Sequence, residues 1–222
     1  MFEHPVDRRS VAAMIDLSLL KPEATREQIE RACSEADQCG FASVFVNSSY
    51  TKLCSDLLAH SRTKVGAVSG FPLGACATEV KVCEARFGID NGAEEIDMVM
   101  NVGALKSGDE GFVEHDIRAV VGACEGKALV KVIIEAALLT REEKITACTT
   151  AQKAGAHFVK TSTGFGPGGA TVEDVALMRR TVGDRMGVKA SGGIRDLETA
   201  MRMVRAGANR IGTSVGRDIV RE

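Results

Sequence analysis

The stretches AGAHFVKTS (residues 154–162) and AGANRIGTS (206–214) share one pattern, in which a small or polar residue and a glycine precede a strand-like run. The same pattern occurs in CGFASVFVN (39–47) and NGAEEIDMVMN (91–101). Each glycine is suited to the left-handed conformation that ends a helix. The glycines lie 52 to 63 residues apart, about twice the roughly 30 residues of one strand–helix–strand step. The repeat therefore predicts a further strand between neighbouring copies.

Apolar runs stand where these further strands are expected: AAMIDLS (12–18), KVGAVSG (64–70), ALVKVIIE (128–135) and GVKASGG (187–193). Between the strands, apolar residues recur at the spacing typical of helices that cover a sheet. These stripes are Ile29, Ala32, Cys33 and Ala36; Phe112, Val113, Ile117, Val120 and Val121; and Leu197, Ala200, Met201 and Val204. Eight strands alternating with helices favour an α/β fold, a (β/α)8 TIM barrel. A doubly wound open sheet is the alternative, but no GxGxxG follows the first strand.

Threonines mark the starts of several predicted helices. TREQ (25–28) and TREE (140–143) are typical of capping boxes, and Thr171 precedes another helical stretch. No linker, low-complexity segment or shift in composition divides the chain. Residues 1–222 are therefore predicted to form a single domain.

The composition argues against several classes of function. The net charge of −2 provides no basic field for nucleic acid. No apolar run approaches the roughly 18 residues that span a bilayer, and the N-terminal MFEHPVDRR has no apolar stretch typical of a signal peptide. Seven cysteines without a CxxC favour reduced thiols that act as small core residues in a cytoplasmic protein. Four scattered histidines argue against a histidine-based metal site.

Polar residues gather in the predicted strands and at their carboxyl ends, where the active sites of such barrels lie. They are Asp16, Ser18, Asn47, Asp97, Asn101, Lys131, Glu135, Lys160, Ser162, Lys189, Ser191 and Ser214. Because side chains alternate between the inside and the outside of a barrel, Lys131 is expected to share a face with Glu135. Three strand lysines and at least two carboxylates thus converge on one barrel mouth. Buried charges are costly, so this set indicates chemistry rather than packing.

A buried lysine beside other cations has a lowered pKa, because lost hydration and like charge both disfavour its protonated form. A neutral amine can attack a carbonyl carbon and form a Schiff base, which then acts as an electron sink. Lys160 is the candidate nucleophile, and a carboxylate such as Asp97 can move protons through a water. The residues therefore predict a Schiff-base lyase and leave its substrate open.

Three glycine-rich loops lead from predicted strands into helices: GFGPGGAT (164–171), SGGIR (191–195) and GTSVG (212–216). Glycines let backbone N–H groups approach an anion, and helix N-termini favour negative charge. In barrels of this kind phosphate groups often bind at the loops after strands seven and eight. SGGIR and GTSVG occupy those positions, so the sequence predicts a phosphate site shared by these loops, with GFGPGGAT at its edge.

Taken together and in order, these stretches resemble deoxyribose-phosphate aldolases. The matching motifs cover nearly the whole chain: IDLSLLKPEAT (15–25), FPLGA (71–75), GAEEIDMVMNVGALKSG (92–108), KVIIE (131–135), FVKTSTGFGPGGAT (158–171), VKASGGIR (188–195) and RIGTS (210–214). The resemblance implies reversible cleavage of 2-deoxy-D-ribose 5-phosphate to D-glyceraldehyde 3-phosphate and acetaldehyde. It also implies a metal-free class I aldolase without a cofactor, and a homodimer as the usual assembly.

The resemblance assigns roles to individual residues. Lys160 of VKTSTG is expected to form the Schiff base, and Lys189 of VKASGG to perturb it and to assist proton transfer. Asp97 of EIDMV is expected to act with a water as proton donor and acceptor, and Asp16 to support the lysines. The substrate phosphate is expected near Gly164, Gly192, Gly193 and Ser214.

The chain departs from the family pattern at several positions. Many members have His-Thr or Leu-Thr where this chain has Leu-Ser at 17–18, and Thr-Cys or Thr-Gly where it has Ala136 and Ala137. A second serine of the last motif is replaced by Val215, and the tail ending in tyrosine that some members carry is not found before Glu222. None of these changes alters the lysines or Asp97, so the chemistry is expected to remain and affinity or rate to vary.

Two other functions remain open from the sequence. One is a different Schiff-base aldolase on the same barrel with another acceptor aldehyde, which the two alanines leave possible. The other is a non-catalytic phosphosugar-binding protein, which gives no reason to keep a reactive lysine out of water. In every case the expected partner is a small sugar phosphate rather than a nucleic acid or a membrane.

Overall fold

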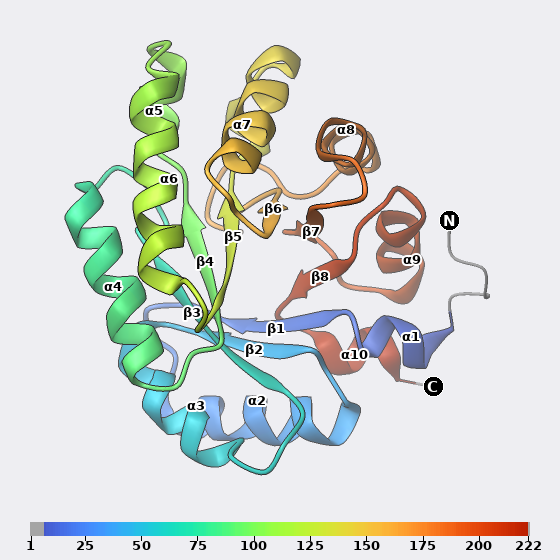
Figure 1. Ribbon diagram of the computed structural model, residues 1–222. Helices are drawn as coiled ribbons and strands as arrows, with labels where there is room; N and C mark the ends of the chain where they lie inside the picture. Colours follow the sequence, from blue (N-terminus) through green and yellow to red (C-terminus); the bar gives the residue numbers. More distant parts are fainter. Residues whose placement is uncertain (1–6, 222) are drawn as a thin grey trace.

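The computed structural model describes residues 7–221 and has a closed barrel of parallel strands at its centre (Figure 1). The strands are β1 (Ile15–Leu19), β2 (Ser43–Val46), β3 (Lys64–Ser69), β4 (Glu95–Val99), β5 (Leu129–Ile133), β6 (Phe158–Lys160), β7 (Gly187–Ser191) and β8 (Arg210–Thr213). The first strand pairs with the last, with Ile15 opposite Ile211, so the sheet is closed. This confirms the predicted (β/α)8 barrel and excludes the open sheet. The segment MFEHPV, including His4, and Glu222 lie outside the described residues.

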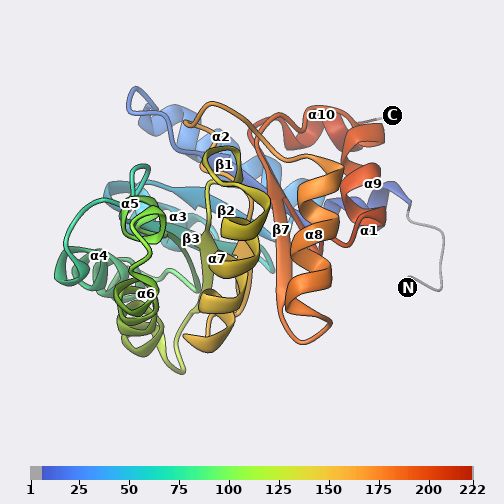
Figure 2. The same cartoon turned by 90° about the horizontal axis from the view of Figure 1, so that it is seen from above.

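Helices surround the barrel and connect successive strands (Figure 2). Those of nine residues or more are α2 (Arg26–Cys39), α4 (Thr78–Asp90), α6 (Glu110–Cys124), α7 (Arg141–Lys153), α8 (Val172–Val182) and α9 (Leu197–Arg205). The shorter ones are α1 (Arg8–Ala12), α3 (Thr51–Leu57), α5 (Val102–Lys106), α10 (Gly216–Val220) and the 3-10 turns η1 (Ser48–Tyr50) and η2 (Ala136–Leu138). Within residues 7–221, no helix is both long and apolar enough to cross a membrane.

The local signals read from the sequence act as expected. Thr25 and Thr140 each accept a hydrogen bond from the backbone N–H three residues on, and the side chains of Gln28 and Glu143 complete the two capping boxes. The four repeat glycines have φ values between 68° and 114°. This left-handed conformation ends each helix and turns the chain into the next strand.

The hydrophobic core lies between the strands and the helices, rather than along the axis of the barrel. Ile96 and Met98 of β4, for example, point outward and pack in this core. The alternating residues of the same strand, Glu95 and Asp97, point inward and are buried. Side chains of opposite charge, with the ring of Phe45 beside them, therefore occupy an axis that in most barrels of this type is filled by branched apolar residues.

Three expectations about the placement of side chains are wrong. Lys131 and Glu135 do not share the barrel interior, because β5 ends at Ile133 and Glu135 adopts a φ of 50°. This conformation turns its carboxylate toward Thr163, whose backbone N–H donates to it. Phe112 is exposed because the helical period turns Val113 toward the core instead. All seven cysteines are free, and four are buried, but Cys83 is exposed and is not a core residue.

Candidate active site

A single oxygen of Asp97 binds two lysines inside the barrel. The Nζ atom of Lys160 lies 2.8 Å from Oδ2 of Asp97, and that of Lys189 lies 2.7 Å from the same oxygen. Strand pairing produces this convergence, because the register of β6 and β7 places Lys160 directly opposite Lys189. All three side chains are at most 2% exposed. The three predicted catalytic residues are thus in direct contact.

Asp16 and Lys131 extend the same group of charges. Oδ2 of Asp16 lies 2.6 Å from Nζ of Lys189, and Oδ1 of Asp97 lies 3.3 Å from Nζ of Lys131. Ser43 donates a hydrogen bond of 2.7 Å to the other oxygen of Asp16. Asp16, predicted to support the lysines, is thus in direct ionic contact with Lys189.

Glu95 and Arg210 close the group at the amino ends of the strands, and neither was singled out from the sequence. The carboxylate of Glu95 binds both Lys131 and Arg210. A second guanidinium nitrogen of Arg210 lies 3.1 Å from Oδ1 of Asp16. Glu95 could have been predicted, because it stands two residues before Asp97 in EIDMV and side chains two residues apart on a strand point to the same side.

These side chains form one charged group, which we call the ion-pair cluster: Asp16, Glu95, Asp97, Lys131, Lys160, Lys189 and Arg210. It contains four cations and three carboxylates. The ring of Phe45 adds a face of negative potential, 3.9 Å from Nζ of Lys189 and 4.4 Å from Nζ of Lys131. One positive charge is still in excess when every group is ionised.

The surroundings of Lys160 make its ammonium group the one that most easily loses a proton, which removes the excess charge. Burial lowers the pKa of Lys160 to about 8, and the cation of Lys189 adds to this effect although Asp97 opposes it. Burial by itself raises the pKa of Asp97, but Lys160, Lys189 and Lys131 outweigh it and hold that pKa far below its usual range. Asp97 is therefore ionised while Lys160 readily becomes neutral, and the neutral amine leaves the cluster balanced.

A cavity of about 420 Å³ opens above this amine at the carboxyl ends of the strands. Lys160 lines the cavity, whereas the other six residues of the cluster do not. The residues predicted to bind phosphate all line it: Gly164, Gly192, Gly193 and Ser214. Two cations and a hydroxyl that were not predicted as site residues, Lys21, Arg195 and Thr163, line it as well.

The backbones of two loops touch beside this cavity. The N–H of Ala170 donates a 3.0 Å hydrogen bond to the carbonyl oxygen of Gly192. A Cβ atom on Gly169 would lie only 2.3 Å from that oxygen, and Gly192 itself has a φ of 90°. Only glycine fits at these two positions. The loop GFGPGGAT therefore holds SGGIR in place as well as lining the cavity.

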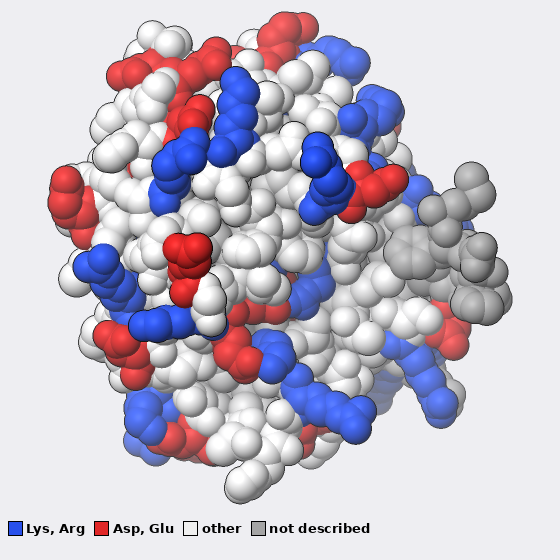
Figure 3. All heavy atoms as spheres, viewed as in Figure 1, with Lys and Arg blue, Asp and Glu red and all other residues white. Residues whose placement is uncertain are grey.

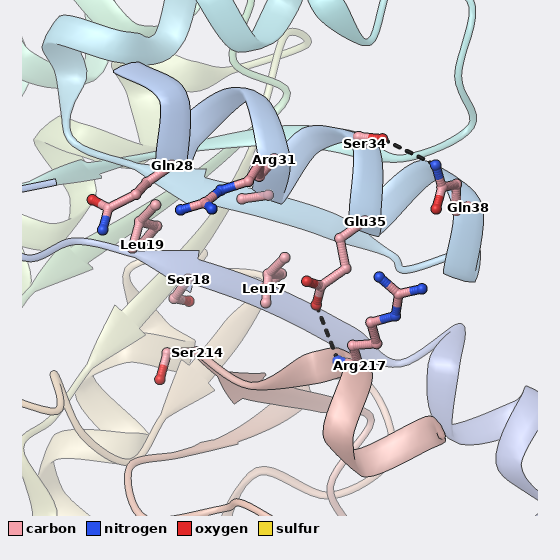
Figure 4. Close-up of a pocket in the computed structure, with 11 residues that line it drawn as sticks. Leu17, Ser18, Leu19, Gln28, Arg31, Ser34, Glu35, Gln38, Ser214 and Arg217 are labelled. Atoms are coloured by element: carbon pink, nitrogen blue, oxygen red, sulfur yellow. Dashed lines mark hydrogen bonds between the residues drawn. The ribbon is translucent and has the colours of Figure 1, made fainter. Parts of the chain in front are cut away.

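A groove of about 510 Å³ lies outside the barrel wall, between α2 and α10 (Figure 4). It shares Ser18 and Ser214 with the cavity above Lys160, and Leu17 of β1 forms part of its floor. Glu35 crosses from α2 to accept a hydrogen bond from the backbone N–H of Arg217. The groove adjoins the cavity but contains none of the cluster.

The positions that depart from the family pattern lie mostly away from the cavity. Ser18 lines it, so the hydroxyl at this position is retained. Ala136 is buried in η2, and Val215 precedes α10; neither lines the cavity. Among residues 7–221, no three His, Cys, Asp or Glu side chains are grouped so that they could hold a metal ion.

A barrel with a desolvated amine beneath a glycine-lined cavity has the features of a class I aldolase. The family model for DeoC/LacD family aldolases matches residues 4–222, and the chain belongs to that family. It is 60% identical over 211 residues to a deoxyribose-phosphate aldolase from Geobacillus sp. (strain WCH70), covering 95% of each chain. The family resemblance noted in the sequence is confirmed.

Solved structures agree with this assignment. A crystal structure of a protein from Coccidioides immitis matches with a TM-score of 0.94 at 43% identity, covering 96% of this chain and 85% of that one. The deoxyribose phosphate aldolase from Aeropyrum pernix, described as tetrameric, matches with a TM-score of 0.90 at 35% identity, covering 96% and 91%. The (β/α)8 barrel is thus the fold of these relatives too.

Replacing Lys189 tests the origin of the lowered pKa of Lys160. In Lys189→Met one neighbouring cation is lost, so the pKa of Lys160 should rise from about 8, and the neutral amine should appear only at higher pH. The measurement is the pH dependence of the rate at which acetaldehyde and cyanoborohydride modify Lys160. Lys106→Met, an exposed lysine on α5, is the control and should keep the original midpoint. An unchanged midpoint in folded Lys189→Met would contradict the assignment.

Proposed function

We propose that this chain is a deoxyribose-phosphate aldolase that reversibly cleaves 2-deoxy-D-ribose 5-phosphate to D-glyceraldehyde 3-phosphate and acetaldehyde. The observation that carries the proposal is the buried amine of Lys160, whose pKa is lowered to about 8 and which lines the cavity at the barrel mouth. The 60% identity to a curated deoxyribose-phosphate aldolase supports the substrate. The class of reaction is carbon–carbon bond cleavage by an aldehyde-lyase.

In the cleavage direction the neutral amine of Lys160 adds to C1 of the open-chain sugar phosphate, and loss of water gives an iminium ion. The C2–C3 bond then breaks. Its electron pair forms the enamine at C1 and C2, the 3-hydroxyl loses its proton, and D-glyceraldehyde 3-phosphate leaves. Protonation of C2 and hydrolysis of the iminium release acetaldehyde and return the free amine. No cofactor is needed, because the iminium is the electron sink.

Asp97 is the proposed proton acceptor and donor, acting through a water. Its carboxylate is ionised, because the neighbouring lysines hold its pKa far below the usual range despite burial. Lys189 binds the same oxygen at 2.7 Å, so it keeps Asp97 in position when the nitrogen of Lys160 becomes part of the iminium. Asp16, 2.6 Å from Nζ of Lys189, in turn fixes that lysine.

Replacing the nucleophile tests the mechanism directly. Borohydride with substrate should add a covalent adduct to wild-type protein at Lys160, located by mass spectrometry of peptides. Lys160→Ala should lose both the adduct and turnover, since no other group of the cluster lines the cavity. Lys144→Ala, which removes a lysine paired with Asp174 away from the barrel axis, is the control and should retain both. Wild-type protein without adduct and without turnover would contradict the proposed function.

The substrate phosphate is proposed to bind at the side of the cavity formed by SGGIR and GTSVG. Gly192 and Gly193 both have positive φ, which brings backbone close to the cavity without a side chain between. Ser214 adds a hydroxyl, Gly164 lies at the edge, and the guanidinium of Arg195 adds a cation suited to phosphate oxygens. Arg195 and Lys21, the other cation that lines the cavity above Lys160, are suited to compensate the negative charge of the phosphate.

Substituting Arg195 separates phosphate recognition from the chemistry. Arg195→Met should raise the KM for 2-deoxyribose 5-phosphate about tenfold or more, because a hydrogen bond to a charged group contributes about 1.5–3 kcal/mol. The KM for unphosphorylated 2-deoxyribose should change little. Arg205→Met, on the opposite end of α9, is the matched control for loss of one arginine. Equal effects on both sugars would place the phosphate elsewhere.

The partners are proposed to be the sugar phosphate and acetaldehyde, together with a second copy of this chain in the cytoplasm. Free cysteines suit a reducing compartment. Charges of both signs are interspersed on the face shown in Figure 3, which provides no basic field for nucleic acid. Exposed apolar side chains on neighbouring helices, Val80 and Phe87 of α4 and Phe112 of α6, offer a surface for self-association.

Light scattering tests the proposed assembly. The mass should be twice the chain mass of 23.5 kDa. Phe87→Ser should shift the protein toward the monomer if the α4 and α6 surface forms the contact, because it removes exposed apolar area. Leu138→Ser removes a somewhat less exposed apolar residue near the barrel mouth and should leave the mass unchanged. A monomeric wild type, or the tetramer described for the Aeropyrum pernix relative, would contradict the dimer.

A further inference from the structure

Two chains of ion pairs connect the amino end of the barrel to the amine of Lys160. One runs from Glu95 through Lys131 to Asp97, with 3.3 Å between Nζ of Lys131 and Oδ1 of Asp97. The other begins at Arg210, which lies 3.1 Å from Asp16. It continues through Lys189, 2.6 Å from Asp16 and 2.7 Å from Asp97. Both chains therefore end on the carboxylate that holds Lys160.

The outer members of these chains lie at the end of the barrel opposite the cavity. Glu95 and Arg210 are the first residues of β4 and β8, whereas Lys160 is the last residue of β6. Glu95 also lines a second cavity, of about 340 Å³, whose rim carries Lys64, Glu94, Lys127 and His157. Neither Glu95 nor Arg210 lines the cavity above Lys160, so neither can touch a substrate bound there.

We propose that Glu95 and Arg210 are positioning residues that set the fraction of neutral Lys160 from the far end of the barrel. This inference rests on the proposed role of Lys160 as the Schiff-base nucleophile. The cluster has four cations and three carboxylates, and it is balanced when Lys160 is neutral. Removing one charge at the amino end therefore changes the balance that Lys160 experiences.

The two residues should act with opposite sign. Loss of the negative charge of Glu95 leaves a second uncompensated cation in the cluster, which disfavours protonated Lys160. Loss of the positive charge of Arg210 removes the excess, which favours protonated Lys160. If Glu95 and Arg210 had a purely structural role, losing either charge would weaken packing but would not shift the pKa of Lys160 in opposite directions.

Other charged groups near the amino end do not provide this control. The side chain of Glu94 is about half exposed and pairs with Lys64 at 2.5 Å, on the outer face of the barrel. His157 accepts a hydrogen bond from the backbone N–H of Val130, and burial together with Lys131 lowers its pKa, so it adds no charge at neutral pH. Lys127 is exposed, and solvent screens it from the axis.

The experiment measures the pH at which Lys160 is half reactive in the intact protein. Acetaldehyde with cyanoborohydride modifies the amine, butylamine gives the pH dependence of the reagents alone, and peptide mass spectrometry confirms the site. Glu95→Gln should move the midpoint down by about one pH unit, and Arg210→Gln should move it up by about as much. The double variant should return it to within about 0.3 units of wild type, because their charge changes cancel.

Two further variants separate charge from packing. Arg210→Lys keeps the charge but changes the geometry, so it should keep the wild-type midpoint. Glu94→Gln, one residue from Glu95 but on the exposed face, should do the same. If Glu95→Gln does not fold, the contrast between Arg210→Gln and Arg210→Lys decides the question alone. Midpoints that do not move, or that move in the same direction for both charges, overturn the inference. Wild-type protein that is never modified at Lys160 would instead overturn the proposed function.

Discussion

The carboxylate of Asp97 is the constraint on which the rest of the site depends. One of its oxygens holds Lys160 and Lys189 together, although two ammonium groups repel each other strongly when they are buried. A second buried pair in the same protein shows the contrast: Lys81 and Asp116 join α4 and α6 as one cation with one anion. That pair is balanced and serves packing. The cluster in the barrel has one cation too many, and the excess falls on the residue that reaches the cavity.

The location of the hydrophobic core makes this arrangement possible. The apolar faces of the strands pack outward against the helices, so most of the hydrophobic core lies outside the barrel, and the ring of Phe45 packs beside the charges on its axis. The interior of the barrel can therefore hold the ion-pair cluster, whose members differ in their exposure to the cavity. Six members of the cluster are enclosed by one another, and only the seventh, Lys160, lines the cavity. The outward faces of the strands thus form the hydrophobic core, and the inward faces of the same strands carry the ion-pair cluster.

The sequence predicted the barrel and the central residues because both depend on short-range patterns. The repeated glycines marked four strands and separate apolar runs marked the other four, and alternation placed Asp97, Lys160 and Lys189 inside. The partners of Lys131 were not predicted, because register across strands decides them: Lys131 lies opposite Asp97 and binds Glu95, not Glu135. The positive φ of Glu135 could not be predicted either, because alternation assumes an extended backbone and a positive φ is rare in residues other than glycine.

The contact between Gly169 and Gly192 has a consequence for redesign of the mouth. Backbone touches backbone there, so no side-chain library at either position can widen the opening without separating the two loops. Phe165 is different: it lines the cavity, half exposed, with its ring centroid 5.3 Å from that of Phe71 in an edge-to-face arrangement. A smaller side chain at Phe165 would change the size of the opening through side chains alone, because the two loops are joined through their backbones. Gly169 and Gly192 fix the distance between the two loops, whereas Phe71 and Phe165 contact each other only through their side chains.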